Sequence, residues 1–221
     1  MCFSSSVSFG AGAVLGIAGV ACLKKVQQPK QILFASIPLL FSLQQTAEGF
    51  VWIATKNQSY TDLLPVSACT FLFFAQVLWP LWVPLSFLLI EKNDKRKIPL
   101  YILTGLGAIL GLYHLFCLVV YQVEIDISGK HIAYRLNHPE GIIPFENTLY
   151  ILVTIVPPFF SSIKRMWSLG LAGLFSFLIT AFIFQHWIVS VWCFFAAIIS
   201  VIIWFLMDNI NDDSEMNFAT W

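Results

Sequence analysis

Charged residues are scarce in this chain of 221 residues, since Asp, Glu, Lys and Arg make up only 11% of it. Soluble domains contain about 25%. The formal net charge is zero, so the basic surplus typical of nucleic-acid-binding proteins is also missing. Hydrophobic residues account for 58% of the sequence and its mean hydropathy is +0.81. This composition excludes an ordinary soluble domain and predicts an integral membrane protein surrounded by membrane lipids.

Several motifs that would fix a chemistry are absent. The five cysteines are scattered and form no CxxC pair, which argues against a zinc ribbon and a disulfide framework. The sequence has no HxxxH, HExxH or CxxCH, so haem attachment through CxxCH is not expected. The last apolar stretch carries no lysine that could form a Schiff base, so retinal is not expected either.

Seven apolar stretches are present, and we expect each of them to cross the bilayer as a helix. Nine of the twelve basic residues lie in alternate connections, which should therefore be cytoplasmic. The predicted fold is an all-α seven-transmembrane-helix bundle over residues 1–207, with the N-terminus outside. An acidic cytoplasmic tail, residues 208–221, would follow it. The stretches are residues 5–23, 33–54, 66–90, 99–121, 147–163, 168–185 and 188–206.

One outer connection, residues 122–146, is long. Residues 123–127 alternate apolar and charged side chains, Ser128 and Gly129 supply a turn, and the alternation resumes over residues 131–136. This pattern predicts a small, exposed extracytoplasmic β-hairpin. The hairpin would be either a lid over an outward-facing pocket or a solvated hairpin with no role at the pocket.

The second stretch, residues 33–54, carries a carboxylate, Glu48, where most of the sequence is apolar. A carboxylate inside a bilayer is costly, so it is expected to have a partner and a function. His114, in the fourth stretch, lies at a similar depth in the outer half and shares a helix face with Gly107 and Gly111. We therefore expect Glu48 and His114 to meet in an outward-facing polar pocket. The polar residues expected to line it are Gln44, Gln45, Gln76 and Ser8.

The pocket has three interpretations. In the first, Glu48, His114 and His186 ligate zinc or another divalent transition metal, and metal-bound water attacks a lipid or small amphiphile, as in a metal-dependent hydrolase. In the second, the protein is a small transporter or ligand-binding membrane protein that uses Glu48 as a protonation switch. In the third, the polar cluster is purely structural and fixes helix packing. The first interpretation makes Glu48 and His114 catalytic, and it is slightly preferred on sequence alone.

Three segments carry a resemblance to a known family: the opening MCFSSSVSFGAG, the Gln-Gln-x-x-Glu of the second stretch, and residues Ser190 to Ala197. They resemble a family of uncharacterised bacterial multi-pass membrane proteins, a domain of unknown function. The resemblance implies placement in a bacterial cytoplasmic (inner) membrane and implies no activity.

Overall fold

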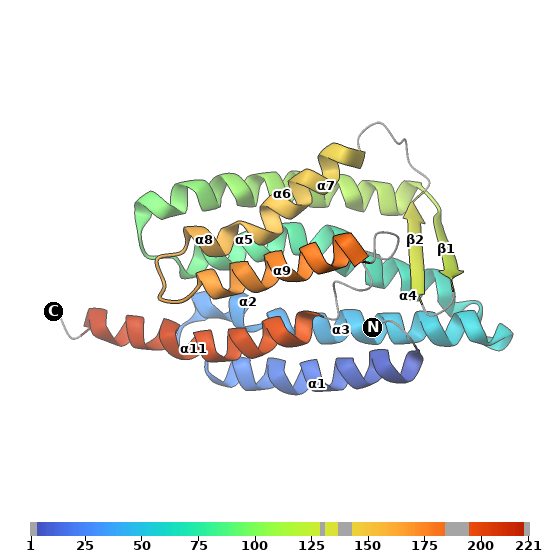
Figure 1. Cartoon of the computed structure of the whole chain (residues 1–221), viewed down its shortest axis with the longest axis horizontal. Coiled ribbons are helices and arrows are strands. Elements are labelled where there is room, and N and C mark those ends of the chain that lie inside the picture. The colour runs from blue at the N-terminus through green and yellow to red at the C-terminus, as the bar shows by residue number, and fades with distance from the viewer. Residues whose placement is uncertain (1–3, 129–130, 137–142, 184–194, 219–221) are drawn as a thin grey trace.

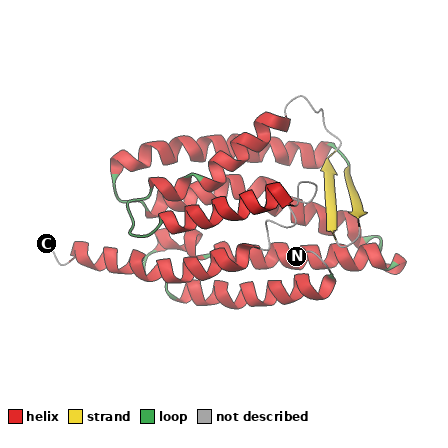
Figure 2. Cartoon of the chain, viewed as in Figure 1, coloured by secondary structure: helices red, strands yellow, loops and turns green. Residues whose placement is uncertain are grey.

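The computed structural model describes residues 4–128, 131–136, 143–183 and 195–218. This part of the chain is mostly helical, and its longest helices run side by side along one axis with a two-stranded hairpin across one end (Figures 1 and 2). The elements are α1 (Ser5–Lys24), η1 (Pro29–Gln31), α2 (Ile32–Ala35), α3 (Ile37–Lys56), η2 (Gln58–Tyr60), α4 (Leu63–Leu72), η3 (Phe73–Leu78), α5 (Trp79–Ile90), α6 (Asp94–Val120), β1 (Val123–Ser128), β2 (His131–Leu136), α7 (Ile143–Ile155), α8 (Pro157–Phe160), α9 (Trp167–Ile183) and α11 (Ala196–Phe218).

Three of the described helices are long and apolar enough to cross a membrane: α1, α6 and the continuous helix formed by α4, η3 and α5. The helix α3 matches α1 in length, with 20 residues, but its interior carries Gln44, Gln45 and Glu48. The apolar segments in α7, α9 and α11 are shorter. A membrane protein is therefore indicated, while the seven-crossing count and its orientation stay predictions.

The helices α1 and α3 pack closely through small residues. A Cβ added at Gly19 would lie 2.7 Å from the backbone nitrogen of Leu39, and one at Gly12 would lie 3.0 Å from Thr46 Oγ1. The Ser42 hydroxyl donates a hydrogen bond of 2.6 Å to the Gly12 carbonyl across this contact. The glycines of α1 therefore face α3, and the opposite face of α1 exposes large apolar side chains suited to lipid.

The predicted β-hairpin is present, with β1 and β2 antiparallel. It is less exposed than expected, because one face lies on α3 and α4. Ile132 packs with Val51 and Trp52, and the Tyr134 ring stacks on Phe71 with centroids 4.8 Å apart. The hairpin therefore packs on these two helices and does not project freely into solvent.

Two predicted boundaries need correction. The helix α7 begins at Ile143, inside the predicted loop 122–146, and its helical run breaks at Val156 before the short α8. The break follows from Pro157 and Pro158, which have no backbone N–H to donate to the carbonyls four residues back. At the other end of the chain, α11 continues to Phe218, so most of the predicted acidic tail is helical.

The last helix is fixed to the first by polar contacts at their shared end. The Lys25 ammonium forms a 2.8 Å ion pair with Asp208 and lies over the Trp204 ring. Asn211 donates to the Lys25 carbonyl and accepts from the Gln31 side chain. These contacts place α11 against α1 and η1.

Candidate functional site

The π-helical segment η3 interrupts the long helix α4–α5 and leaves two backbone carbonyls without their usual helical partners. The Trp79 N–H donates to the Phe74 carbonyl, five residues back, which leaves the Ala75 carbonyl available. Pro80 has no N–H to donate to the Gln76 carbonyl. Both carbonyls turn to other helices: the Tyr150 hydroxyl of α7 donates to Ala75, and the His114 ring of α6 contacts Gln76.

Glycines on α6 allow His114 to reach this segment. A Cβ added at Gly111 would lie 2.7 Å from the Val77 carbonyl oxygen, and one at Gly107 would lie even closer to the Pro80 carbonyl oxygen. No side chain fits at either position without moving backbone. The two glycines therefore bring α6 into direct contact with η3 and α5, as the small-xxx-small pattern predicts.

His114 is paired with Glu146, a carboxylate on the first turn of α7. Its Nδ1 lies 2.9 Å from the Gln76 carbonyl oxygen and its Nε2 lies 3.6 Å from Glu146 Oε2. A carbonyl oxygen only accepts, so Nδ1 carries a hydrogen and Nε2 is the nitrogen that faces the carboxylate. Both side chains are buried, and the Tyr113 hydroxyl also interacts with Glu146. We call His114 and Glu146 the His114 pair.

Glu48 is fully buried, with 0% of the residue exposed, in the interior of the helical bundle. Its Oε2 accepts a 3.3 Å hydrogen bond from the Gln45 amide. Ser8 of α1 is also 0% exposed, and its hydroxyl has no hydrogen-bond partner among the residues that the structure describes. Its chain neighbour Phe9 lies against Gly49, which places Ser8 close to the level of Glu48. We call Ser8, Gln45 and Glu48 the Glu48 cluster.

Gln44 connects α3 to α5. Its Oε1 accepts a 2.7 Å hydrogen bond from the Trp79 indole N–H. The rings of Trp79 and Phe41 lie 4.1 Å apart, centroid to centroid. Of the other predicted pocket residues, Gln45 donates to Glu48, and Gln76 contributes its backbone carbonyl to His114.

The His114 pair and the Glu48 cluster are two separate polar centres. The long helix α4–η3–α5 contacts α3 on one side and α6 on the other (Figure 1). The His114 ring interacts with Gln76, Glu146 and Tyr113, whereas the Glu48 carboxylate accepts from Gln45. The direct pairing of His114 with Glu48 stays a prediction.

A metal centre at these residues finds no support in the structure. Within residues 4–128, 131–136, 143–183 and 195–218, no three His, Cys, Asp or Glu side chains come together as a metal site would require. The third predicted ligand, His186, lies outside the described residues. The metal hypothesis therefore stays a prediction.

Sequence reasoning missed Glu146 because it treated the residue as part of the outer loop. A signal was present: Glu146, Tyr150 and Val153 lie at i, i+4 and i+7, so they share one helix face. That face is buried against α6, with Val153 in a cluster with Leu103 and Leu110. Extending the apolar periodicity of the fifth stretch backwards by one turn would have placed Glu146 on the buried side.

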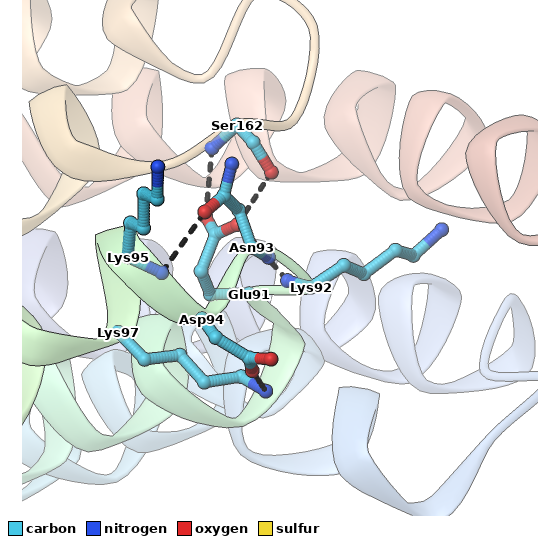
Figure 3. A network of polar contacts seen from close by, with 7 residues as sticks. All are labelled: Glu91, Lys92, Asn93, Asp94, Lys95, Lys97 and Ser162. Atoms are coloured by element: carbon cyan, nitrogen blue, oxygen red, sulfur yellow. Dashed lines mark hydrogen bonds and ion pairs between the residues drawn. The ribbon is translucent and has the colours of Figure 1, made fainter.

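A second missed carboxylate, Glu91, joins two loops at the opposite end of the bundle (Figure 3). It is 3% exposed and accepts hydrogen bonds from the backbone N–H groups of Lys92, Asn93 and Ser162 and from the Ser162 hydroxyl. Arg96 donates to the Ser161 carbonyl at 2.7 Å beside it. Burial alone would raise the pKa of Glu91, but the hydrogen bonds from Ser162, Asn93 and Lys92 outweigh burial and hold that pKa below its usual value. We call these contacts the Glu91 clamp.

The comparisons with known proteins point to one family. The family described as "Family of unknown function (DUF6629)" matches residues 1–216, almost the whole chain. No curated protein and no solved structure is significantly similar to the chain.

Proposed function

Because this chain belongs to DUF6629, a family of unknown function, its activity has to be argued from its own residues. We propose that it is a multi-pass protein of a bacterial cytoplasmic membrane that binds or carries a small ligand, with Glu48 as its protonation switch. The observation that carries the proposal is the complete burial of this carboxylate inside a bundle in which three of the described helices are long and apolar enough for a bilayer.

Burial makes the charge of Glu48 expensive, so the residue gains free energy by binding a proton or a cationic group. Glu48 has polar neighbours that can hydrogen-bond to the protonated or to the ionised carboxyl group. The Gln45 amide can donate to the carboxylate, and the unpartnered Ser8 hydroxyl offers a further donor or acceptor nearby. A ligand that brings its own hydrogen-bonding group would satisfy Ser8, which gives the cluster a physical reason to bind one.

Two features favour this function over a metal-assisted hydrolase. The two ligands expected from the sequence, Glu48 and His114, lie in separate centres, and both ring nitrogens of His114 already face other groups. A hydrolase would need an open metal position with at least three protein ligands around it. A protonation switch needs only one buried acid and a change in its surroundings.

Proton movement through the purified protein tests the proposal. Proteoliposomes would contain a pH-sensitive dye, and a potassium gradient with valinomycin would impose a membrane potential. The wild-type protein is expected to admit protons, and Glu48→Gln is expected to abolish the flux because an amide cannot take up a proton. Asp126→Asn, which removes an exposed carboxylate from the hairpin, is the matched control and should behave as wild type. Equal flux through wild type, Glu48→Gln and protein-free liposomes would contradict the proposal.

A further inference from the structure

The Glu91 clamp brings two basic segments together. One is the loop and first turn of α6, and the other is the loop between α8 and α9. Glu91 holds them through Ser162, and Arg96 holds them through the Ser161 carbonyl. The basic residues assembled in this way are Lys92, Lys95, Arg96, Lys97, Lys164 and Arg165.

Most of these cations lack a carboxylate partner. Lys97 forms an ion pair with Asp94, and the carboxylate of Glu91 is occupied by backbone and serine donors. Among the described residues, no salt bridge involves Lys95, Arg96, Lys164 or Arg165. Holding like charges together costs free energy, which an anion bound between them would recover.

Arg165 adds a backbone feature. It has φ = 63°, and it is the only non-glycine residue with a positive φ in the part of the chain that the structure describes. Left-handed backbone is unfavourable for arginine, and such strain concentrates at functional positions. The loop therefore adopts an unfavourable backbone conformation at Arg165, a residue that is exposed next to the Glu91 clamp.

The surface next to these cations is apolar. Lys95 begins a stripe on α6 that continues through Ile98 and Ile102, which are 62% and 60% exposed. Two residues after Arg165, Trp167 is 57% exposed at the start of α9. Unpaired cations that continue into exposed apolar side chains match the two halves of an anionic phospholipid, its phosphate and its acyl chains.

We propose that the six basic residues around the Glu91 clamp form a binding site for the phosphate headgroup of an anionic phospholipid, with the acyl chains along α6 and α9. The clamp fixes the distance between the two basic segments, so the site depends on position as well as on charge. This inference rests on the membrane placement proposed above and is independent of the role of Glu48.

Native mass spectrometry of the purified full-length protein tests the site, with phosphatidylglycerol as the probe and phosphatidylcholine as the uncharged reference. Wild type is expected to retain phosphatidylglycerol preferentially. Replacing two site cations, in Lys164→Gln with Arg165→Gln, should weaken that preference about tenfold or more. The matched control, Lys24→Gln with Lys30→Gln, removes the same charge from two exposed lysines near the α1–α2 turn and should keep the preference.

Glu91→Gln separates positioning from charge. It makes the patch more positive, so a purely electrostatic attraction predicts stronger phosphatidylglycerol retention. A site held by the clamp predicts weaker retention, because the amide cannot accept all four hydrogen bonds from the two loops. Ser162→Ala provides a milder version of the same test if Glu91→Gln does not fold.

Three outcomes would overturn the site. One is an equal loss in the control and the Lys164/Arg165 variant, which would indicate diffuse attraction to cytoplasmic lysines. Another is stronger retention in both Glu91→Gln and Ser162→Ala. The third is stabilisation of the protein by inorganic phosphate in phosphatidylcholine, together with no preferential retention of phosphatidylglycerol. That result would identify a free anion as the ligand. If proton flux proves independent of Glu48 while these lipid results hold, only the proposed function fails.

Discussion

His114 Nε2 lies 3.6 Å from Glu146 Oε2, and the other ring nitrogen lies 2.9 Å from the Gln76 carbonyl oxygen. One imidazole thereby connects three segments: α6, which carries it, α7 and the π-helical η3. Glu146 was not part of the pocket that the sequence suggested, and Gln76 contributes its backbone carbonyl. The position of the ring depends on a proline and on two glycines.

Removing either member of the His114 pair is expected to destabilise the fold. Glu146→Gln or His114→Gln should each lower the free energy of unfolding by about 1–2 kcal/mol, because a buried partner loses its counterpart. The double variant should lose about 1 kcal/mol less than the sum of the two, because the residues interact. Detergent denaturation of the purified variants measures this coupling. Strict additivity would show that the contact contributes nothing.

Gly111→Ala should destabilise the protein by about 1–3 kcal/mol, since the new methyl group would lie 2.7 Å from the Val77 carbonyl oxygen and force α6 away from η3. Gly105→Ala, on the same helix, is the matched control because nothing lies within 4 Å of the added methyl group. The control should be neutral or stabilising by up to about 1 kcal/mol from helix propensity. Thermal unfolding of both variants in one detergent checks the difference. Similar effects would show that the close contact is absent.

The Glu91 clamp should make stability depend on pH. The pKa of Glu91 is lower in the folded protein than its ordinary value of 4.5, so the folded state favours the carboxylate. Its contribution is therefore complete above about pH 4.5 and is lost as the pH falls through the folded-state value.

Comparison with Glu91→Gln measures this contribution. Wild type should be more stable than the variant at neutral pH, and the difference should shrink as the pH falls below 4.5. Asp126→Asn, at an exposed carboxylate, controls for general acid effects. A difference that stays constant from neutral pH to pH 3 would contradict the role assigned to the carboxylate.

Elemental analysis addresses the metal hypothesis directly. If Glu48, His114 and His186 shared one ion, purified protein would contain stoichiometric zinc or another transition metal, and both Glu48→Gln and His114→Ala would remove it. Since the first two residues lie in separate centres, we expect their substitution to leave the metal content unchanged. Parallel loss of metal in both variants would restore the hydrolase interpretation.

Local sequence patterns anticipated the elements of this fold better than their contacts. Alternation predicted the two strands. The spacing of Gly107 and Gly111 predicted which face of α6 packs closely. Each of these depends on backbone geometry within a few residues, which a single sequence contains.

Local sequence patterns could not predict in the same way which polar residues contact each other. Glu48 and His114 lie at similar predicted depths, but depth along a helix says nothing about which helix stands between them. Here the α4–η3–α5 helix contacts both α3, which carries Glu48, and α6, which carries His114 (Figure 1). Glu91 was missed for a related reason, because its partner Ser162 lies 71 positions away in the chain. Serine and backbone donors also leave no charge pattern in the sequence.

The π-helical segment places two consecutive free carbonyls, Ala75 and Gln76, opposite donors from two different helices. If the wide turn migrated along the helix by one residue, the carbonyl held by Tyr150 would be recaptured by its own helix and a new one would be released. Tyr150 of α7 would then lose its acceptor, whereas His114 of α6 would keep the Gln76 carbonyl, because Pro80 has no N–H with which to recapture it. Pro80 therefore fixes the contact with α6, while the contact with α7 depends on the position of the wide turn.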